Sequence, residues 1–230
     1  MELDGIKWVP MVVDTVRTIA ATFVGAGLAF ILWLRQQKIV HDREQIAAGN
    51  SALITLARQL NSSELIRRAV GEELEKKGQI EGAPNWLRLR PIQTRLEENF
   101  RFDFGKLDFL VESENPGFLI DLHVVESNYL NLVNDLKLYL DRHNDAQVVF
   151  SSKLNVSPEQ LVDISEIEKC LELPKLVELT LLANAIIESS QKLPNEIQKT
   201  SVQLHQMLKV RFAGKKFIRP AVTQQRNPSA

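Results

Sequence analysis

The sequence predicts an all-α protein in which a single N-terminal transmembrane helix continues into a helical stalk and then a helical bundle. One uncharged apolar run lies near the N-terminus, and apolar residues recur at helical spacing through most of the remaining chain. The hydrophobic fraction of 44% excludes wholesale disorder. A single cysteine, Cys170, excludes an internal disulfide framework and a cysteine-based zinc site.

The predicted transmembrane helix covers residues 11–34 and follows a short N-terminal segment, residues 1–10. From Thr18 to Leu34 the chain has 17 residues without a charge. About 20 helical residues are needed to cross a hydrocarbon layer of roughly 30 Å. A cleaved signal peptide is one alternative, but it requires a positive start and a small-residue cleavage site, and the start MELDGIK is acidic. A buried core helix of a soluble protein is the other alternative.

Basic residues flank this segment unequally. Arg35, Lys38 and Arg43 follow it, whereas Lys7 and Arg17 precede it or lie within its start. The positive-inside rule therefore favours a single-pass protein of the inner (plasma) membrane whose C-terminal domain is cytoplasmic. A reducing compartment agrees with the single cysteine.

Small residues recur every four positions within the predicted span, at Ala21, Gly25 and Ala29. This spacing lets a second membrane helix approach closely, and it predicts a homo-oligomer packed through that face. The ordinary alanine and glycine content of a membrane helix is the alternative interpretation.

Residues 35–77 are predicted to form the stalk. This stretch contains no proline, and Ile39, Ile46, Leu53 and Leu60 recur every seven residues, as in a coiled coil. Glycine and proline then predict a loop over roughly residues 78–95. We expect a bundle domain over residues 78–212 that the stalk completes.

The segment FRFDF, residues 100–104, alternates aromatic and charged residues without an evident partner strand. We interpret it as an extended segment that places Phe100, Phe102 and Phe104 on one face of the core. A short helix through Phe109 and Leu110 is expected to follow.

The strongest soluble helix signal begins at Phe118. Seven apolar residues follow one another at alternating spacings of four and three: Phe118, Leu122, Val125, Tyr129, Leu132, Leu136 and Tyr139. This heptad pattern predicts packing against other helices. The solvent-facing side is expected to carry Asp121, Glu126, Asn131 and Lys137.

Prolines divide the remainder of the predicted bundle. Ser157 and Pro158 are a typical helix start, and Pro174 separates that helix from the next. Pro194 is predicted to open a last helix, whose apolar stripe contains Ile197, Ser201, Leu204 and Leu208.

No phosphate-binding glycine loop, nucleophile elbow or paired-cysteine motif occurs in the chain, so the sequence predicts a protein that is not an enzyme and needs no cofactor. The best metal-ligand constellation is Asp121, His123 and Glu126, since His123 and Glu126 share a helix face, with Asp141, His143 and Asp145 farther along the chain. Solvated surface charge is the favoured interpretation of these residues. A membrane-tethered metal-dependent hydrolase is the corresponding alternative function.

The C-terminus is strongly basic. Residues 197–230 contain seven lysines and arginines and no acid, whereas residues 1–196 carry 21 basic and 29 acidic residues. The central basic residues are Lys209, Arg211, Lys215, Lys216 and Arg219. Such a segment suits an anionic lipid surface, nucleic acid, or the acidic remainder of the chain, and nucleic acid is the least favoured. Residues 213–230 are predicted to be a disordered basic tail.

Two stretches, AAGNSALITLARQLN (Ala47–Asn61) and FDFGKLDFLVESENPGFL (Phe102–Leu119), resemble a group of bacterial single-pass membrane-anchored helical proteins that are described only as hypothetical. The resemblance implies a bacterial inner-membrane setting and assigns no functional residue. We therefore expect a non-enzymatic membrane protein whose cytoplasmic helical domain self-associates or docks a protein partner. Such a protein would act as a scaffold or as a membrane effector, for example in bacterial stress or phage defence.

Overall fold

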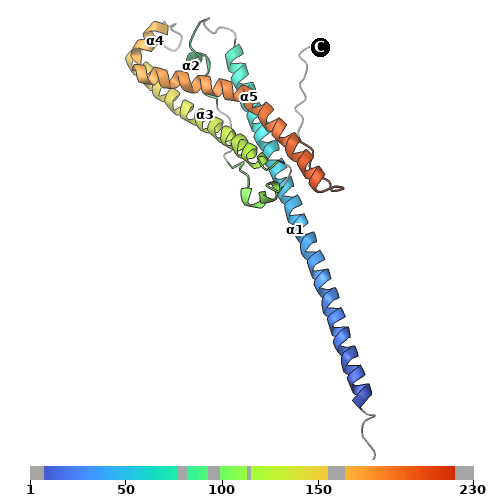
Figure 1. Cartoon of the computed structure of the whole chain (residues 1–230). Coiled ribbons are helices and arrows are strands. Elements are labelled where there is room, and N and C mark those ends of the chain that lie inside the picture. The colour runs from blue at the N-terminus through green and yellow to red at the C-terminus, as the bar shows by residue number, and fades with distance from the viewer. Residues whose placement is uncertain (1–7, 77–81, 93–98, 113–114, 155–163, 221–230) are drawn as a thin grey trace, which may run out of the picture. The chain divides into compact units, whose positions relative to one another are not determined.

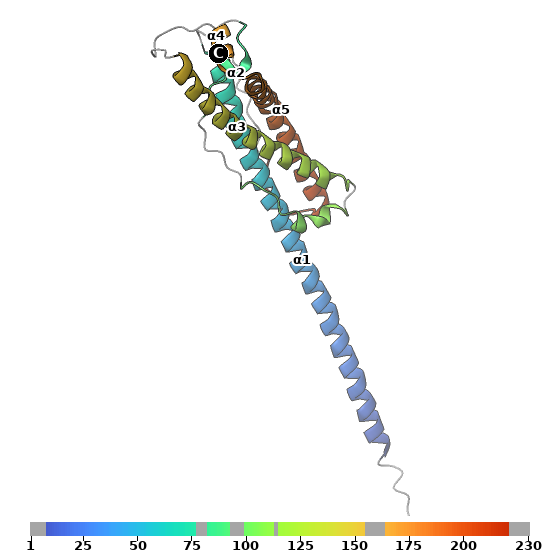
Figure 2. The ribbon, with the colours of Figure 1, turned by 90° about the vertical axis from the view of Figure 1, so that its left-hand side faces the viewer.

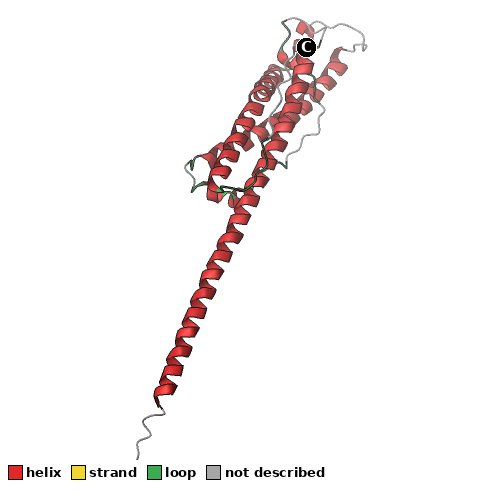
Figure 3. Cartoon of the chain, turned by 90° about the vertical axis from the view of Figure 1, so that its right-hand side faces the viewer, coloured by secondary structure: helices red, strands yellow, loops and turns green. Residues whose placement is uncertain are grey.

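The computed structural model describes residues 8–76, 82–92, 99–112, 115–154 and 164–220. The described residues form helices, 3₁₀ turns and loops and contain no strand, which confirms the all-α class (Figure 3). The elements, in chain order, are α1 (Trp8–Glu75), α2 (Asn85–Arg88), the 3₁₀ turns η2 (Phe104–Lys106) and η3 (Asp108–Leu110), α3 (Phe118–Leu154), α4 (Ile164–Cys170) and α5 (Leu173–Arg211).

The chain divides into two units, Met1–Ala47 and Ala48–Ala230. The first unit contains the N-terminal part of α1, where large apolar side chains are exposed: Val12, Phe23 and Leu28 expose 57%, 75% and 58% of their surface. An 18-residue window of α1 has a mean hydropathy of 1.7 and no buried residue. Among the described residues, α1 is the one helix that is long and apolar enough to cross a membrane.

Two threonine hydroxyls in this part of α1 bond to backbone carbonyls of the same helix. The Thr18 hydroxyl donates to the Asp14 carbonyl at 2.8 Å, and the Thr22 hydroxyl donates to the Thr18 carbonyl at 2.8 Å. The rings of Phe30 and Trp33 stack with centroids 5.9 Å apart. Internal hydrogen bonds of this kind lower the cost of a threonine in any environment that excludes water, because the hydroxyl then has no other partner.

The second unit is a bundle built on three long helical segments, residues 48–75 of α1 together with α3 and α5 (Figures 1 and 2). Gly49 of α1 lies against Leu208 of α5. A Cβ atom at Gly49 would lie 2.6 Å from a methyl carbon of Leu208, so this position has room only for hydrogen unless Leu208 moves. Farther along α1, the Tyr129 hydroxyl of α3 bonds to the Ser62 hydroxyl at 3.1 Å.

The heptad stripe predicted for α3 forms the centre of this bundle. All seven stripe residues are buried, and Phe118, Leu122, Tyr129 and Leu132 expose 0% of their surface. The prediction is therefore confirmed residue by residue. Burying a large apolar side chain contributes about 1.5–3 kcal/mol relative to leaving it in water, so this stripe is a main source of the stability of the unit.

The prediction that Glu126 faces solvent is wrong. Glu126 is buried, and its carboxylate Oε1 accepts the backbone N–H of Phe102 at 2.6 Å. The segment around Phe102 has no strand partner among the described residues, so its backbone donor needs a side-chain acceptor. The carboxylate supplies one from the edge of the α3 stripe.

Residues 99–103 form neither a helix nor a strand, the Arg101 N–H bonds to the Asn99 carbonyl at 3.0 Å in a tight turn, and the three phenylalanines of the segment are not equally buried. Phe102 is buried, whereas Phe100 and Phe104 are half-buried. Phe100 packs beside Tyr129 with ring centroids 6.2 Å apart, and Phe104 already belongs to η2. Phe109 and Leu110 are buried in η3, so the expected short helix is present as two 3₁₀ turns.

The prediction that Pro194 opens a new helix is also wrong, because Pro194 lies inside α5. A proline within a helix removes one hydrogen bond and clashes with the preceding turn, at a cost of about 3 kcal/mol. Here Leu193, Pro194 and Ile197 are all buried, so the burial of this stretch offsets the penalty and the helix continues. Figure 1 shows α5 changing direction along its length, as expected for a proline kink.

Two further predictions concern the loop over residues 78–95 and the helix start at Ser157. The predicted loop over 78–95 contains α2, whose Trp86 is buried. The predicted helix start at Ser157 and Pro158 lies outside the described residues.

Candidate functional site

The C-terminal basic segment has a definite structure up to residue 220. α5 ends at Arg211, and Gly214 adopts a left-handed φ of 81°, which favours glycine. Beyond this turn, the backbone N–H of Ile218 donates to Asn50 Oδ1 of α1 at 3.1 Å. The prediction of a disordered tail from residue 213 is therefore wrong for residues 213–220, and residues 221–230 lie outside the described part of the chain.

Arg211 differs from Lys209, Lys215, Lys216 and Arg219 because its side chain forms an ion pair and cation–π contacts within the protein. Its guanidinium contacts Glu112 at 3.0 Å and lies over the rings of Phe109 and Phe212, 5.3 and 5.7 Å from their centroids. The ring of Phe212 in turn packs against Phe217 at 6.1 Å. Cation–π contacts and ring packing thus hold the segment after α5 against η3.

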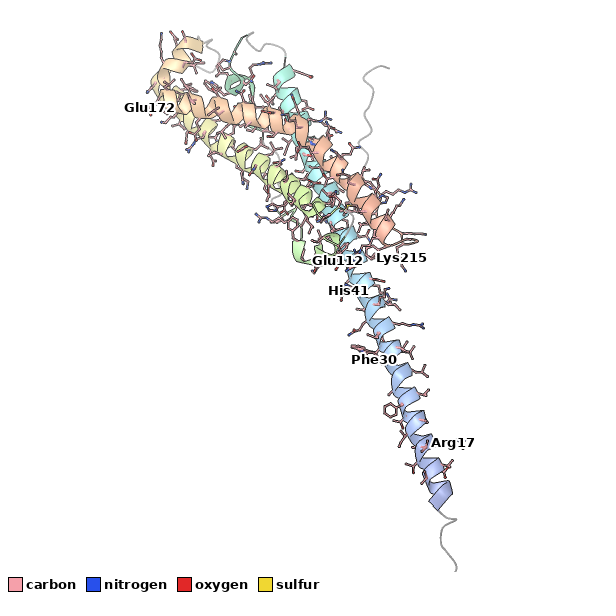
Figure 4. The ribbon with its side chains drawn as sticks, in the orientation of Figure 1. Arg17, Phe30, His41, Glu112, Glu172 and Lys215 are labelled. Carbon is pink, nitrogen blue, oxygen red and sulfur yellow. The ribbon has the colours of Figure 1, made fainter. Side chains whose placement is uncertain are left out.

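The other basic residues in the described part of this segment are exposed. We define the basic patch as Lys209, Lys215, Lys216 and Arg219, together with the exposed apolar residues Val210 and Ile218. None of these four basic side chains contacts a carboxylate within the described residues at ion-pair distance. Figure 4 shows Lys215 just beyond the end of α5.

The fold brings Lys209 and Arg219 of the basic patch near the same residue, His205. His205 lies one turn before Lys209 on α5, and its pKa is lowered by burial and by the positive charges of Lys209 and Arg219. The effect of Arg219 reaches His205 because the chain reverses after Gly214. Lys209 of α5 and Arg219 of the segment that follows it therefore act on the same side chain, although they lie ten positions apart in the chain.

The predicted membrane-packing residues Ala21, Gly25 and Ala29 all lie on exposed positions of α1. A Cβ atom at Gly25 would meet no other atom within 4 Å. Within the part of the chain that the structure describes, no side chain covers this face. Self-association through it stays a prediction.

The residues considered for a metal site do not converge. Glu126 is engaged by the Phe102 backbone, and the exposed His123 packs edge-on against Phe104 with centroids 5.6 Å apart. The described residues contain no group of three histidine, cysteine or acidic side chains placed to hold a metal ion. Cys170, at the end of α4, is a partly buried free thiol.

A buried polar cluster around Tyr139 was not anticipated from the sequence. The Tyr139 hydroxyl contacts the carbonyl oxygens of Trp86 at 2.8 Å and of Leu89 at 2.5 Å, tying α3 to α2. His143 packs beside Tyr139 at 5.7 Å, and its Nδ1 is buried with no hydrogen-bond partner in the described structure. Phe150 stacks on Trp86 at 6.3 Å.

The environment of this cluster favours neutral forms. Burial raises the pKa of the Tyr139 hydroxyl and lowers the pKa of the His143 imidazole. The four-residue spacing of Tyr139 and His143 places both on one helix face, but only the tertiary structure adds Trp86. The geometry suits attachment of α2 to the bundle, because the hydroxyl is used by main-chain carbonyls.

Comparisons of the chain with protein-family models, with curated proteins and with solved structures found no match.

Proposed function

We propose that residues 11–34 anchor the protein in a membrane and that the helical unit beginning at Ala48 acts there without catalysis, by self-association and by docking a protein partner. We place the anchor in a bacterial inner membrane, with the C-terminal unit in the cytoplasm. The orientation follows from Arg35, Lys38 and Arg43 beyond the apolar segment.

A single observation carries the proposal, namely the uncovered apolar surface of α1. An 18-residue window with a mean hydropathy of 1.7 has none of its residues buried. A helix that is apolar on all sides is typical of a membrane span or of a fully buried core. Because this window is not buried in the protein's own core, lipid is the environment that matches its surface.

Self-association is supported by the spacing of Ala21, Gly25 and Ala29. Small residues four apart let helix backbones approach closely in lipid, where van der Waals packing drives helix association. The metal-dependent hydrolase is disfavoured as an alternative because the Glu126 carboxylate is buried against the Phe102 backbone.

Membrane anchoring is tested by alkaline carbonate extraction of membranes from cells that produce the full chain. The proposal expects the protein to stay in the membrane pellet, since carbonate removes peripheral proteins but not spanning helices. Recovery of the protein in the supernatant would contradict the anchor.

Self-association is tested with Gly25→Ile and a matched control, Gly27→Ile. The two glycines lie at nearly the same depth, but two residues rotate a helix by about 200°, so they face different sides. Energy transfer between labelled copies in lipid vesicles should be lost in Gly25→Ile and retained in Gly27→Ile. Equal transfer in both variants would show that copies do not associate through this face.

A further inference from the structure

We propose that the basic patch binds anionic lipid headgroups of the membrane in which α1 is anchored. The patch comprises Lys209, Lys215, Lys216 and Arg219 with the exposed apolar residues Val210 and Ile218. This inference rests on the proposed membrane anchoring, and it gives the C-terminal unit a partner of defined chemistry.

The length of the chain between the proposed span and Gly49 sets an upper limit on the distance from the bilayer to the point where α5 meets α1. The first residue of the patch comes directly after Leu208, and Leu208 lies against Gly49 of α1. Gly49 is fifteen residues beyond Leu34, where the proposed span ends. At 1.5 Å per helical residue, Gly49 lies no more than about 23 Å from Leu34. The headgroup layer itself occupies roughly 5–7 Å of this distance, and any tilt or bend shortens the remainder.

The composition of the patch favours a lipid surface over other anions. Lys209 and Val210 are adjacent in the chain, as are Ile218 and Arg219, so each exposed apolar residue of the patch has a basic neighbour in the sequence. Val210 exposes 75% of its surface and Ile218 exposes 43%. Basic residues attract the anionic headgroups while apolar side chains enter the interface, a combination typical of membrane-surface segments.

The backbone that carries the patch is fixed by contacts within the protein. Gly214 sets the chain reversal, Asn50 holds the Ile218 N–H, and Phe212 is buried. Fixing the segment in advance reduces the conformational entropy that binding would otherwise cost. Arg211 takes no part, because its guanidinium is paired with Glu112 and packed on aromatic rings.

The test places a fluorescent probe on the patch in the full chain. In a Cys170→Ser background, Ile218→Cys is labelled and the protein is reconstituted into vesicles of phosphatidylcholine, alone or mixed with phosphatidylglycerol. Quenching by headgroup nitroxide lipids reports contact of the probe with the surface. We expect quenching to be stronger in the anionic vesicles and to weaken at high salt, because salt screens charges beyond a Debye length of about 8 Å at physiological ionic strength.

Charge variants assign the contact to the patch. Lys215→Gln with Lys216→Gln should lower the ratio of surface-bound to unbound patch about 25-fold, at about fivefold for each basic residue near the surface. The matched control is Lys169→Gln with Lys175→Gln, which removes two exposed lysines of α4 and α5 outside the patch and should leave quenching unchanged. Circular dichroism checks that each variant is folded.

Two outcomes would overturn the inference. Equal quenching in neutral and anionic vesicles would show that lipid charge is irrelevant, and this comparison requires no charge variant. Displacement of the probe from anionic vesicles by an added DNA duplex, at a lower phosphate concentration than the lipid, would make the patch a nucleic-acid site. Release of the chain from vesicles by carbonate would instead refute the anchor itself, so the two failures are distinguishable.

Discussion

Large apolar side chains are exposed in the N-terminal part of α1 and buried in the bundle that begins at Ala48. Phe23 exposes 75% of its surface, whereas Phe118 exposes 0%. Within α1 itself, Ile39 exposes 52% and Leu53 exposes 1%, although both belong to one seven-residue repeat. Apolar spacing therefore predicts a helix and its apolar face, but it does not say what covers that face.

The comparison also separates two sources of stability. The bundle gains its free energy of folding by burying apolar residues of its own chain. The exposed segment gains nothing in this way, and we propose that transfer into a bilayer supplies the equivalent term. The same substitution should consequently have different effects in the two regions, as the following predictions specify.

The largest expected effect is that of truncating a core aromatic residue. Phe118→Ala should lower the free energy of unfolding of the bundle by about 3–5 kcal/mol, because it removes apolar burial and leaves a cavity. The matched Phe23→Ala, in the exposed segment, should change it by less than about 0.5 kcal/mol. Urea unfolding in detergent, followed by the fluorescence of the buried Trp86, measures both. Equal losses would show that the two regions do not differ as the exposed areas indicate.

The second prediction introduces a charge into each region and expects the larger effect in the exposed segment of α1. Phe23→Arg should disfavour membrane insertion by about 3 kcal/mol, since a charge at the centre of a span is costly. Val148→Arg is the control, because Val148 exposes 70% of its surface on α3 and should tolerate the charge. The fraction of chain retained in carbonate-washed membranes is measured. Full retention of Phe23→Arg would count against a span centred there.

A smaller effect is expected at the junction of α2 and α3. Tyr139→Phe should destabilise the bundle by about 1–3 kcal/mol, because the carbonyl oxygens of Trp86 and Leu89 lose a buried partner. Tyr129→Phe should cost less, since the half-buried Ser62 hydroxyl can bond to water instead. Hydrogen exchange over residues 82–92 should accelerate in Tyr139→Phe. Unchanged exchange there would show that the hydroxyl does not hold α2.

The smallest effect is expected in mild acid. Burial lowers the pKa of His143 in the folded protein below its ordinary value of 6.5, so the unfolded chain takes up a proton first as the pH falls. The contribution of the neutral His143 imidazole to the free energy of unfolding should be fully present above pH 6.5. It should decrease as the pH falls from there to the lowered pKa of the folded protein. The pKa of His205 is lowered too, and it contributes with the same sign.

The variant His143→Gln removes the stronger candidate for this dependence. Urea midpoints measured between pH 7 and pH 5 should fall less steeply in His143→Gln than in the unmodified protein. The double variant His143→Gln with His205→Gln should give the shallowest dependence. An unaltered slope in the double variant would show that acid acts through other groups.

Much of the fold follows from local patterns, and the exceptions have identifiable causes. The α3 stripe from Phe118 to Tyr139 could be predicted because a helix with one apolar face must bury it. Glu126 could not, because its burial depends on an unpaired backbone N–H 24 residues earlier in the chain. The prediction for Pro194 is wrong because the penalty of a proline within a helix is local, and the burial of the residues around it offsets that penalty.

For the candidate site too, one part could be predicted from the sequence and another part could not. The concentration of lysine and arginine after Ile197 is evident from the sequence. The division into a structural Arg211 and an exposed basic patch is not, since it depends on Glu112, Phe109 and Asn50, which are distant in the chain.

The sequence by itself determined the helical class, the apolar character of residues 18–34, and the stripe that α3 buries, because these depend on composition and on spacing within one segment. Only the tertiary structure decided where along α1 the apolar residues become covered, and whether the basic segment is folded. Both depend on contacts between distant residues, such as Gly49 with Leu208 and Asn50 with Ile218. Periodicity within a helix carries no information about such pairings.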